Sequence, residues 1–169
     1  YGTDASGTTG LYGQKIGLGV DAYSDIVNNV ISGNDSLGVL ISGSNVNFFQ
    51  NKVGVNAGGN AAIANNYGGV LVQIGANHTD IGDALPSNRN IISGHNLNNG
   101  FGVRIDSDSN LVAHNYFGLG SDGLTPIPNY DGLNLNDAND NDITNNVASS
   151  NTNFGMSLFS SSFNTYSYN

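Results

Sequence analysis

The chain has 169 residues and a formal net charge of −9, a length typical of one domain, so we expect a single domain over residues 1–169. It contains 29 Asn, 24 Gly and 18 Ser, and all 13 acidic residues are Asp. These residues favour turns over helices, which excludes long α-helices and predicts an all-β fold. Only four Lys and Arg residues are present, too few for a nucleic-acid-binding surface. The absence of Cys excludes disulfides and thiolate metal sites. No apolar run is long enough to predict membrane insertion.

Six copies of the pattern Gly-φ-x-φ, with φ an apolar residue, run along the chain. They begin at Gly17, Gly38, Gly69, Gly102, Gly132 and Gly155. The two φ positions are aliphatic or Met while the residue between them varies, which is the period of two expected for a strand with one buried face. Each copy therefore predicts a short strand, with residues such as Val39 and Ile41 inside and Leu40 outside.

A second pattern follows the first five strands: an Asn with an apolar residue two positions later. The asparagines are Asn29, Asn51, Asn90, Asn115 and Asn146. If equivalent segments stack, Asn lies on Asn, and the side-chain amides can pair along the stack. The sequence therefore predicts an asparagine ladder, which gives the Asn excess a structural cause.

The corner segment before each Gly-φ-x-φ strand alternates between long and short, the short segments being 30–37, 91–101 and 147–154. Successive anchor glycines are 21, 31, 33, 30 and 23 residues apart, and segments 1–16, 53–68 and 116–131 carry the extra length. Repeats of this length without helices predict a β-solenoid of about six coils. Because the long segments recur every second coil, we expect them to project from one side as a ridge.

Four segments carry a resemblance to a known family: Tyr1–Thr8, Val30–Asn34, Gly38–Ile41 and Arg89–Gly94. They resemble the repeats of bacterial right-handed parallel β-helix proteins of the pectate-lyase-like superfamily. The resemblance covers nearly the whole chain and implies a single-stranded, right-handed parallel β-helix with three parallel sheets. It also implies secretion to the cell exterior, in a superfamily that contains both polysaccharide-active enzymes and non-catalytic adhesin or surface repeats.

One surface cluster could bind carbohydrate. Arg104 and Asp106 are expected to point outward from the fourth Gly-φ-x-φ strand, with Asn134 and Asn136 beside them on the fifth. An arginine could grip a sugar acid through a bidentate contact. The alternative is an ordinary surface ion pair of little energetic value. No Glu is available as an acid or base and no second cation lies nearby, so no catalytic residue is assigned.

A short Asx-rich segment has the spacing with which calcium loops begin. Asp137, Asn139 and Asn141 alternate as oxygen ligands would, but the glycine and the bidentate Glu of a calcium loop are missing. An Asx-rich turn explains the segment equally well. Calcium is thus the one candidate cofactor, and no other is expected.

Two functions remain open. The favoured one is a non-catalytic structural or adhesive β-helix segment of an extracellular or cell-surface protein or filament, stacked end to end on itself or on further coils of a longer solenoid. The alternative is a polysaccharide-active lyase, epimerase or hydrolase with a groove on the outward strand face. The favoured partner is therefore another β-helix coil, with an extracellular polysaccharide as the second candidate. Neither end of the sequence shows a helix or polar cap, so both ends are expected to be open.

Overall fold

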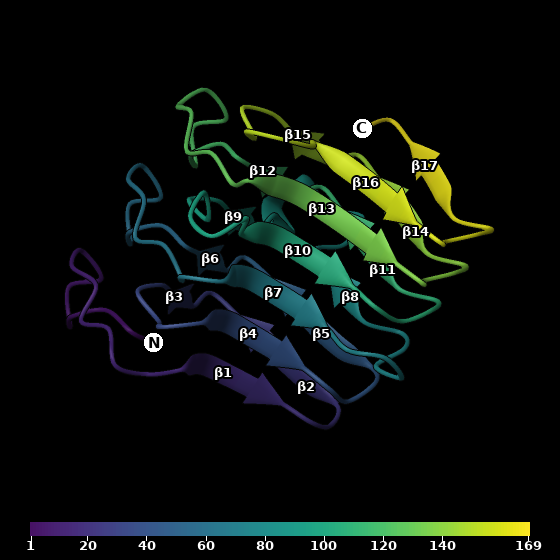
Figure 1. Ribbon diagram of the computed structural model, residues 1–169, viewed down its shortest axis with the longest axis horizontal. Helices are drawn as coiled ribbons and strands as arrows, with labels where there is room; N and C mark the ends of the chain where they lie inside the picture. The colour runs from purple at the N-terminus through teal and green to yellow at the C-terminus, as the bar shows by residue number, and fades with distance from the viewer.

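The computed structural model describes all residues from 1 to 169 as a stack of coils (Figure 1). Sheet 1 contains β1 (Ile16–Val20), β4 (Leu37–Ile41), β7 (Gly68–Val72), β10 (Phe101–Ile105), β13 (Asp131–Asn136) and β16 (Met156–Phe159). Sheet 2 contains β2 (Ser24–Val27), β5 (Val46–Phe49), β8 (Asp80–Ile81), β11 (Leu111–Ala113), β14 (Asp142–Thr144) and β17 (Thr165–Ser167). Sheet 3 contains β3 (Val30–Ile31), β6 (Lys52–Val53), β9 (Ile91–Ile92), β12 (Tyr116–Phe117) and β15 (Val147–Ala148).

All strands within each sheet are parallel, and each strand pairs with its equivalents one coil earlier and one coil later. The predicted all-β, three-sheet parallel β-helix is therefore confirmed. The only helix is the 3-10 turn η1 (Pro86–Asn88). The structure has no candidate membrane-spanning helix.

The predicted strand register is also confirmed. The inward residues of four central strands of sheet 1 are fully buried: Val39, Ile41, Val70, Val72, Val103, Ile105, Leu133 and Leu135. The residues between them are partly exposed on the outer face: Leu40, Leu71, Arg104 and Asn134. A slip of one residue would exchange these two sets, so burial of the apolar set fixes the register.

The anchor glycines lie at a crowded corner, which explains their recurrence in the sequence. A Cβ added at Gly38 would lie 2.7 Å from Asn65 Nδ2 and 2.8 Å from the Gly69 carbonyl oxygen. Only glycine lets sheet 1 start this close to the preceding corner and to the next coil.

The three long segments form hairpins that project on one side of the stack, at the left in Figure 1. Each is closed by one antiparallel bridge: Thr3–Gly10, Val55–Ala62 and Leu119–Pro126. The hairpins also touch each other across the intervening short coil. Ala57 N donates to Gly7 O at 2.8 Å, and Ser121 N donates to Gly59 O at 2.8 Å. The predicted ridge with a two-coil repeat is therefore confirmed, and its members are in direct contact.

Candidate functional site

The structure brings the five predicted ladder asparagines together at the corner between sheets 2 and 3. They form one column, Asn29, Asn51, Asn90, Asn115 and Asn146, which Asn169 extends. In each step the backbone N–H and the Nδ2 of one asparagine donate to the Oδ1 of the next, at 2.8–3.2 Å. From Asn51 onward, each Nδ2 also donates to a carbonyl of the preceding coil. The ladder therefore has a direction, because each Oδ1 accepts only from the asparagine of the preceding coil.

A second ladder, which the sequence analysis missed, lies at the corner between sheets 3 and 1. Its members are Asn34, Asn65, His95, Asn129 and Asn151. All but Asn151 are buried. Alignment of Ile31-Ser32-Gly33-Asn34 with Ile92-Ser93-Gly94-His95 in the sequence contained the signal, because it places His95 where the other coil has Asn.

His95 takes over the hydrogen bonds of an asparagine. Its Nδ1 lies 3.0 Å from Asn129 Oδ1, which can only accept, so Nδ1 carries the proton. Its Nε2 lies 3.1 Å from Asn65 Nδ2 and accepts from that amide. Full burial lowers the pKa of His95 to about 4, so the ring is neutral near neutral pH.

A third, shorter ladder lies at the corner between sheets 1 and 2. It runs through Thr79, Asn110, Asn141 and Asn164. Thus two of the three corners carry side-chain columns through most of the stack, and the third carries one through four coils. These columns satisfy turn backbone groups that no strand partner reaches.

Two of the three calcium candidates use their side-chain oxygens in hydrogen bonds. Asn141 Oδ1 accepts from Asn110 within the third ladder. Asn139 Oδ1 accepts from Ser162 N, while its own N–H and Nδ2 donate to Asp108 Oδ1. Asp137 is exposed and its carboxylate makes no hydrogen bond. The structure contains no cluster of three His, Cys, Asp or Glu side chains able to hold a metal ion.

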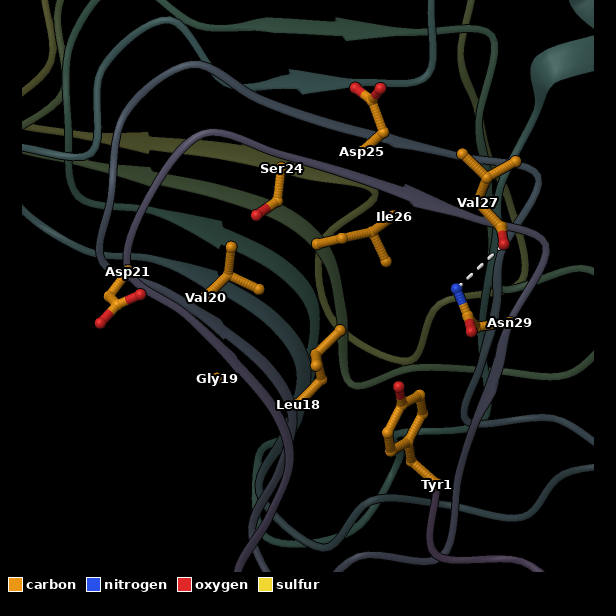
Figure 2. Close-up of a pocket in the computed structure, with 10 residues that line it drawn as sticks. All are labelled: Tyr1, Leu18, Gly19, Val20, Asp21, Ser24, Asp25, Ile26, Val27 and Asn29. Carbon is orange, nitrogen blue, oxygen red and sulfur yellow. Dashed lines mark hydrogen bonds between the residues drawn. The ribbon is translucent and has the colours of Figure 1, made fainter.

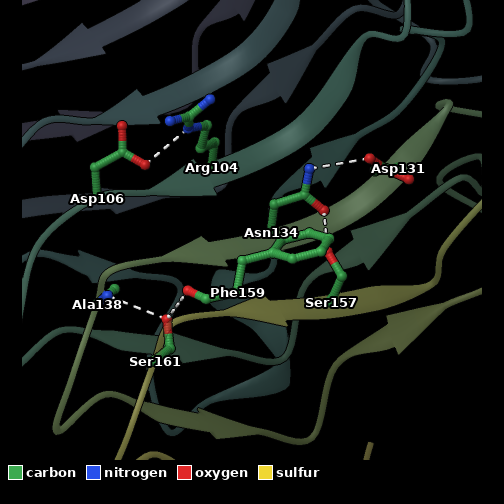
Figure 3. A network of polar contacts seen from close by, with 8 residues as sticks. All are labelled: Arg104, Asp106, Asp131, Asn134, Ala138, Ser157, Phe159 and Ser161. Atoms are coloured by element: carbon green, nitrogen blue, oxygen red, sulfur yellow. Dashed lines mark hydrogen bonds and ion pairs between the residues drawn. The ribbon is translucent and has the colours of Figure 1, made fainter.

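Three of the carbohydrate candidates, Arg104, Asp106 and Asn134, are neighbours on the outer face of sheet 1 (Figure 3). Arg104 Nε donates to Asp106 Oδ1 at 2.7 Å, and this bond raises the pKa of the guanidinium. Asn134 lies beside Arg104 in the strand register but bonds to Asp131 and Ser157 instead. Asn136 lies beside Phe159, further along the strand. Three of the four side chains are therefore engaged in hydrogen bonds, and no pocket is found on this face.

The hollow at the N-terminal face is the largest in the structure, about 480 Å³ (Figure 2). Leu18, Val20 and Ile26 line it together with Tyr1, and their side chains point into the hollow. Val20 and Ile26 continue columns whose next members, Ile41 and Phe48, are fully buried. The hollow is therefore the uncovered end of the core and not a pocket on its side.

The C-terminal face is more open, because its apolar residues are more exposed than Val20 and Ile26, which are each 7% exposed. Leu158 is 45% exposed, whereas Leu135, one coil earlier in the same column, is fully buried. Tyr166 is 36% exposed above the fully buried Ile143. Each face therefore presents apolar core residues that lack a neighbouring coil.

Comparison with protein families, with curated proteins and with solved structures found no match to this chain.

Proposed function

We propose that this chain is a non-catalytic structural or adhesive β-helix segment of an extracellular surface protein or filament, in which the stacking of coils is itself the function. We further propose that it is a non-enzymatic member of the pectate-lyase-like superfamily, on the resemblance of its repeats. The observation that carries the proposal is the chemistry of the two end faces.

The end faces are complementary in hydrogen bonding. In the first ladder each Oδ1 accepts from the preceding coil, so its N-terminal end at Asn29 leaves an acceptor without a partner and its C-terminal end at Asn169 leaves a donor without a partner. Asn29 Oδ1 receives no hydrogen bond. At the other face, Asn169 has a free backbone N–H. Another coil of the same repeat would pair with either face and bury its apolar residues.

The alternative is a polysaccharide-active enzyme or binding protein using the Arg104 face. An enzyme acting on an acidic glycan needs convergent charged groups that are free to contact the substrate. Here the one cation on the face is already paired with Asp106. The outer face of sheet 1 thus supports the enzyme less well than the end faces support stacking.

Sedimentation velocity and electron microscopy of the purified chain test the proposal. We expect concentration-dependent rods that lengthen along the coil axis. Met156→Asp combined with Leu158→Asp places charge on the C-terminal face and should leave short soluble species. The single change Leu158→Asp should act in the same direction and keeps Met156 packed against the core.

A matched control carries the same added charge away from the end faces. Ile74 and Leu85 are 86% and 57% exposed in the middle of the stack, so their change to Asp should leave assembly intact. A dispersed wild-type monomer that depolymerises uronate polymers would overturn the proposal in favour of the enzyme.

A further inference from the structure

The hairpin ridge contains two filled sockets, and the short coil corner after β15 repeats their geometry. In the first socket, Ser32 Oγ donates to Val55 O at 2.7 Å and Gly33 N donates to Ile63 O at 3.1 Å. The short corner after β3 thus holds the two ends of the hairpin that follows it.

The second socket repeats these contacts two coils later. Ser93 Oγ donates to Leu119 O at 2.8 Å, and Gly94 N donates to Ile127 O at 3.1 Å. Each corner thus uses one hydroxyl and one backbone N–H, with the second residue in the left-handed region, φ 74° at Gly33 and 95° at Gly94.

The third short corner has the same shape, but no hairpin follows it in the structure. Ser149 and Ser150 stand at the equivalent positions, because Ala148, the residue before them, pairs with Phe117 as Ile92 does. Ser150 has φ 62°, in the same left-handed region. Both residues are exposed, and neither the Ser149 Oγ nor the Ser150 N–H makes a hydrogen bond. Two donors are therefore presented in the arrangement that holds a hairpin twice elsewhere.

Ser150 differs from the other two corners in carrying a side chain. At Gly33 and Gly94 an added Cβ would contact mainly the preceding hairpin, at Gly2 O and Gly54 O respectively. At Gly33 the nearest atom of the following hairpin, Ile63 Cγ2, would lie further from the added Cβ, at 3.3 Å. By analogy, the Ser150 Cβ lies closer to the preceding hairpin than to the one that would follow.

The matching hairpin is at the opposite end of the same chain. In the hairpin closed by the Thr3–Gly10 bridge, Leu11 N donates to Gly2 O, as Ile63 and Ile127 do to their own glycines. The carbonyls of Thr3 and Leu11 correspond to those held in the two filled sockets. Neither accepts a hydrogen bond in the structure.

The tip of this hairpin supplies a third match. In the ridge, Ala57 N and Ser121 N each donate to a glycine carbonyl of the hairpin two coils earlier. Ala5 is the equivalent donor in the first hairpin, and Gly123 O is the equivalent acceptor in the last. Both are without a partner.

From these three matched pairs we infer that the C-terminal socket at Ser149 and Ser150 binds the N-terminal hairpin of a second copy of this chain, head to tail and in phase. The inference rests on the proposed stacking function and specifies its partner and rotational register. The contact is heterologous, so it repeats from copy to copy and extends the ridge along a growing rod.

Disulfide trapping tests the register, because the chain has no cysteine of its own. Asp25 and Thr165 begin and end one outward column of sheet 2. Within one chain they are five coil steps apart, about 24 Å at ~4.8 Å per step. A disulfide needs Cα atoms within about 7 Å. The double variant Asp25→Cys/Thr165→Cys can therefore crosslink only between copies, and in-phase stacking predicts covalent oligomers under mild oxidation.

The control pair is Gly19→Cys/Thr165→Cys, which joins sheet 1 to sheet 2. A Cβ at Gly19 meets nothing within 4 Å, so this change is tolerated. This pair crosslinks only if one copy is rotated about the coil axis so that its sheet 1 stacks on sheet 2 of the other copy. Association with crosslinking of the control pair, or of neither pair, would overturn the inference while leaving the proposed stacking intact. Failure of the wild-type chain to associate at all would overturn both.

A socket variant tests the hairpin contact directly. Ser149→Asp places a carboxylate against the two hairpin carbonyls and should weaken association at least tenfold. Ser87→Asp adds the same charge at an exposed site away from both faces and should have no effect. Equal association of the two variants would overturn the assignment of the socket.

Discussion

Asn65 Nδ2 lies 3.1 Å from His95 Nε2, so a histidine replaces an asparagine inside a buried amide ladder. The ring nitrogen accepts one hydrogen bond from Asn65, while its Nδ1–H donates to Asn129. Unlike an amide, the ring can be protonated, and its cation would have no acceptor at Nε2. The ladder therefore contains one pH-sensitive step.

His95 should make the stability of the protein depend on pH. Burial lowers its pKa to about 4, below the unfolded value of 6.5, so between these values the unfolded chain binds a proton that the folded chain does not. Stability should be complete above about pH 6.5 and fall as pH decreases toward 4, by on the order of 3 kcal/mol. Urea unfolding at several pH values measures this fall.

The matched variant is His95→Asn, which restores the ladder residue of the other coils. It removes the titrating group and should flatten the pH dependence between 4 and 6.5, while His78 and His114 remain. A pH dependence as steep as that of the wild type would show that another group is responsible.

Asn115→Ala tests the energetic value of the first ladder. Asn115 Oδ1 accepts from Asn90, and its Nδ2 donates to Ile81 O and to Asn146 Oδ1. Removing it leaves buried donors and acceptors without partners, so we expect a loss of roughly 2–4 kcal/mol in the free energy of unfolding. Asn136→Ala is the control, because the Asn136 side chain makes no hydrogen bond and its loss should cost less than about 0.5 kcal/mol. Similar losses in the two variants would contradict a structural role of the ladder.

The fold was predictable from the sequence because the glycines and the apolar alternation repeat in every coil. Gly38, Val39 and Ile41 have equivalents in each coil, and one face of every strand in the interior coils is buried, so a single pattern specified the register. The first ladder was predictable for the same reason, since each Asn keeps a fixed distance from an apolar residue.

The second ladder and the sockets were harder to predict. His95 occupies one position in a column of asparagines, so a search for a repeated Asn does not find that position. The sockets depend on backbone groups and on a single hydroxyl, as at Ser93 and Gly94, whose partners lie in a hairpin of different sequence. Any residue type can supply a backbone carbonyl, so the sequence does not show that this contact recurs and the structure does.

Gly38→Ala tests the crowded corner at the start of sheet 1. The added Cβ would lie 2.8 Å from the Gly69 carbonyl oxygen, and backbone must move to admit it. We expect a loss of about 2–4 kcal/mol in the free energy of unfolding. Gly19→Ala, two residues beyond Gly17 in β1, meets open space and should change stability by less than about 0.5 kcal/mol. Equal thermal shifts for both variants would show that crowding does not explain the anchor glycine.

Arg104→Ala tests whether Arg104 only forms a surface ion pair or also binds carbohydrate. The Arg104 side chain is 36% exposed and its partner Asp106 is 23% exposed, so solvent screens the pair and its loss should cost less than about 1 kcal/mol. Arg89→Ala is the comparison, because Arg89 donates to His114 O and lies 3.8 Å above the Tyr116 ring. Losing both contacts should cost more, about 1–2 kcal/mol.

Calorimetric titration with a uronate oligosaccharide completes the Arg104 test. Under the stacking function we expect no binding by the wild type and none by Arg104→Ala. A different result would be binding by the wild type and by Arg89→Ala but not by Arg104→Ala. In that case the Arg104 guanidinium must leave Asp106 to bind a sugar carboxylate. The outer face of sheet 1 would then be a carbohydrate site, and the polysaccharide-active alternative would replace stacking as the function best supported.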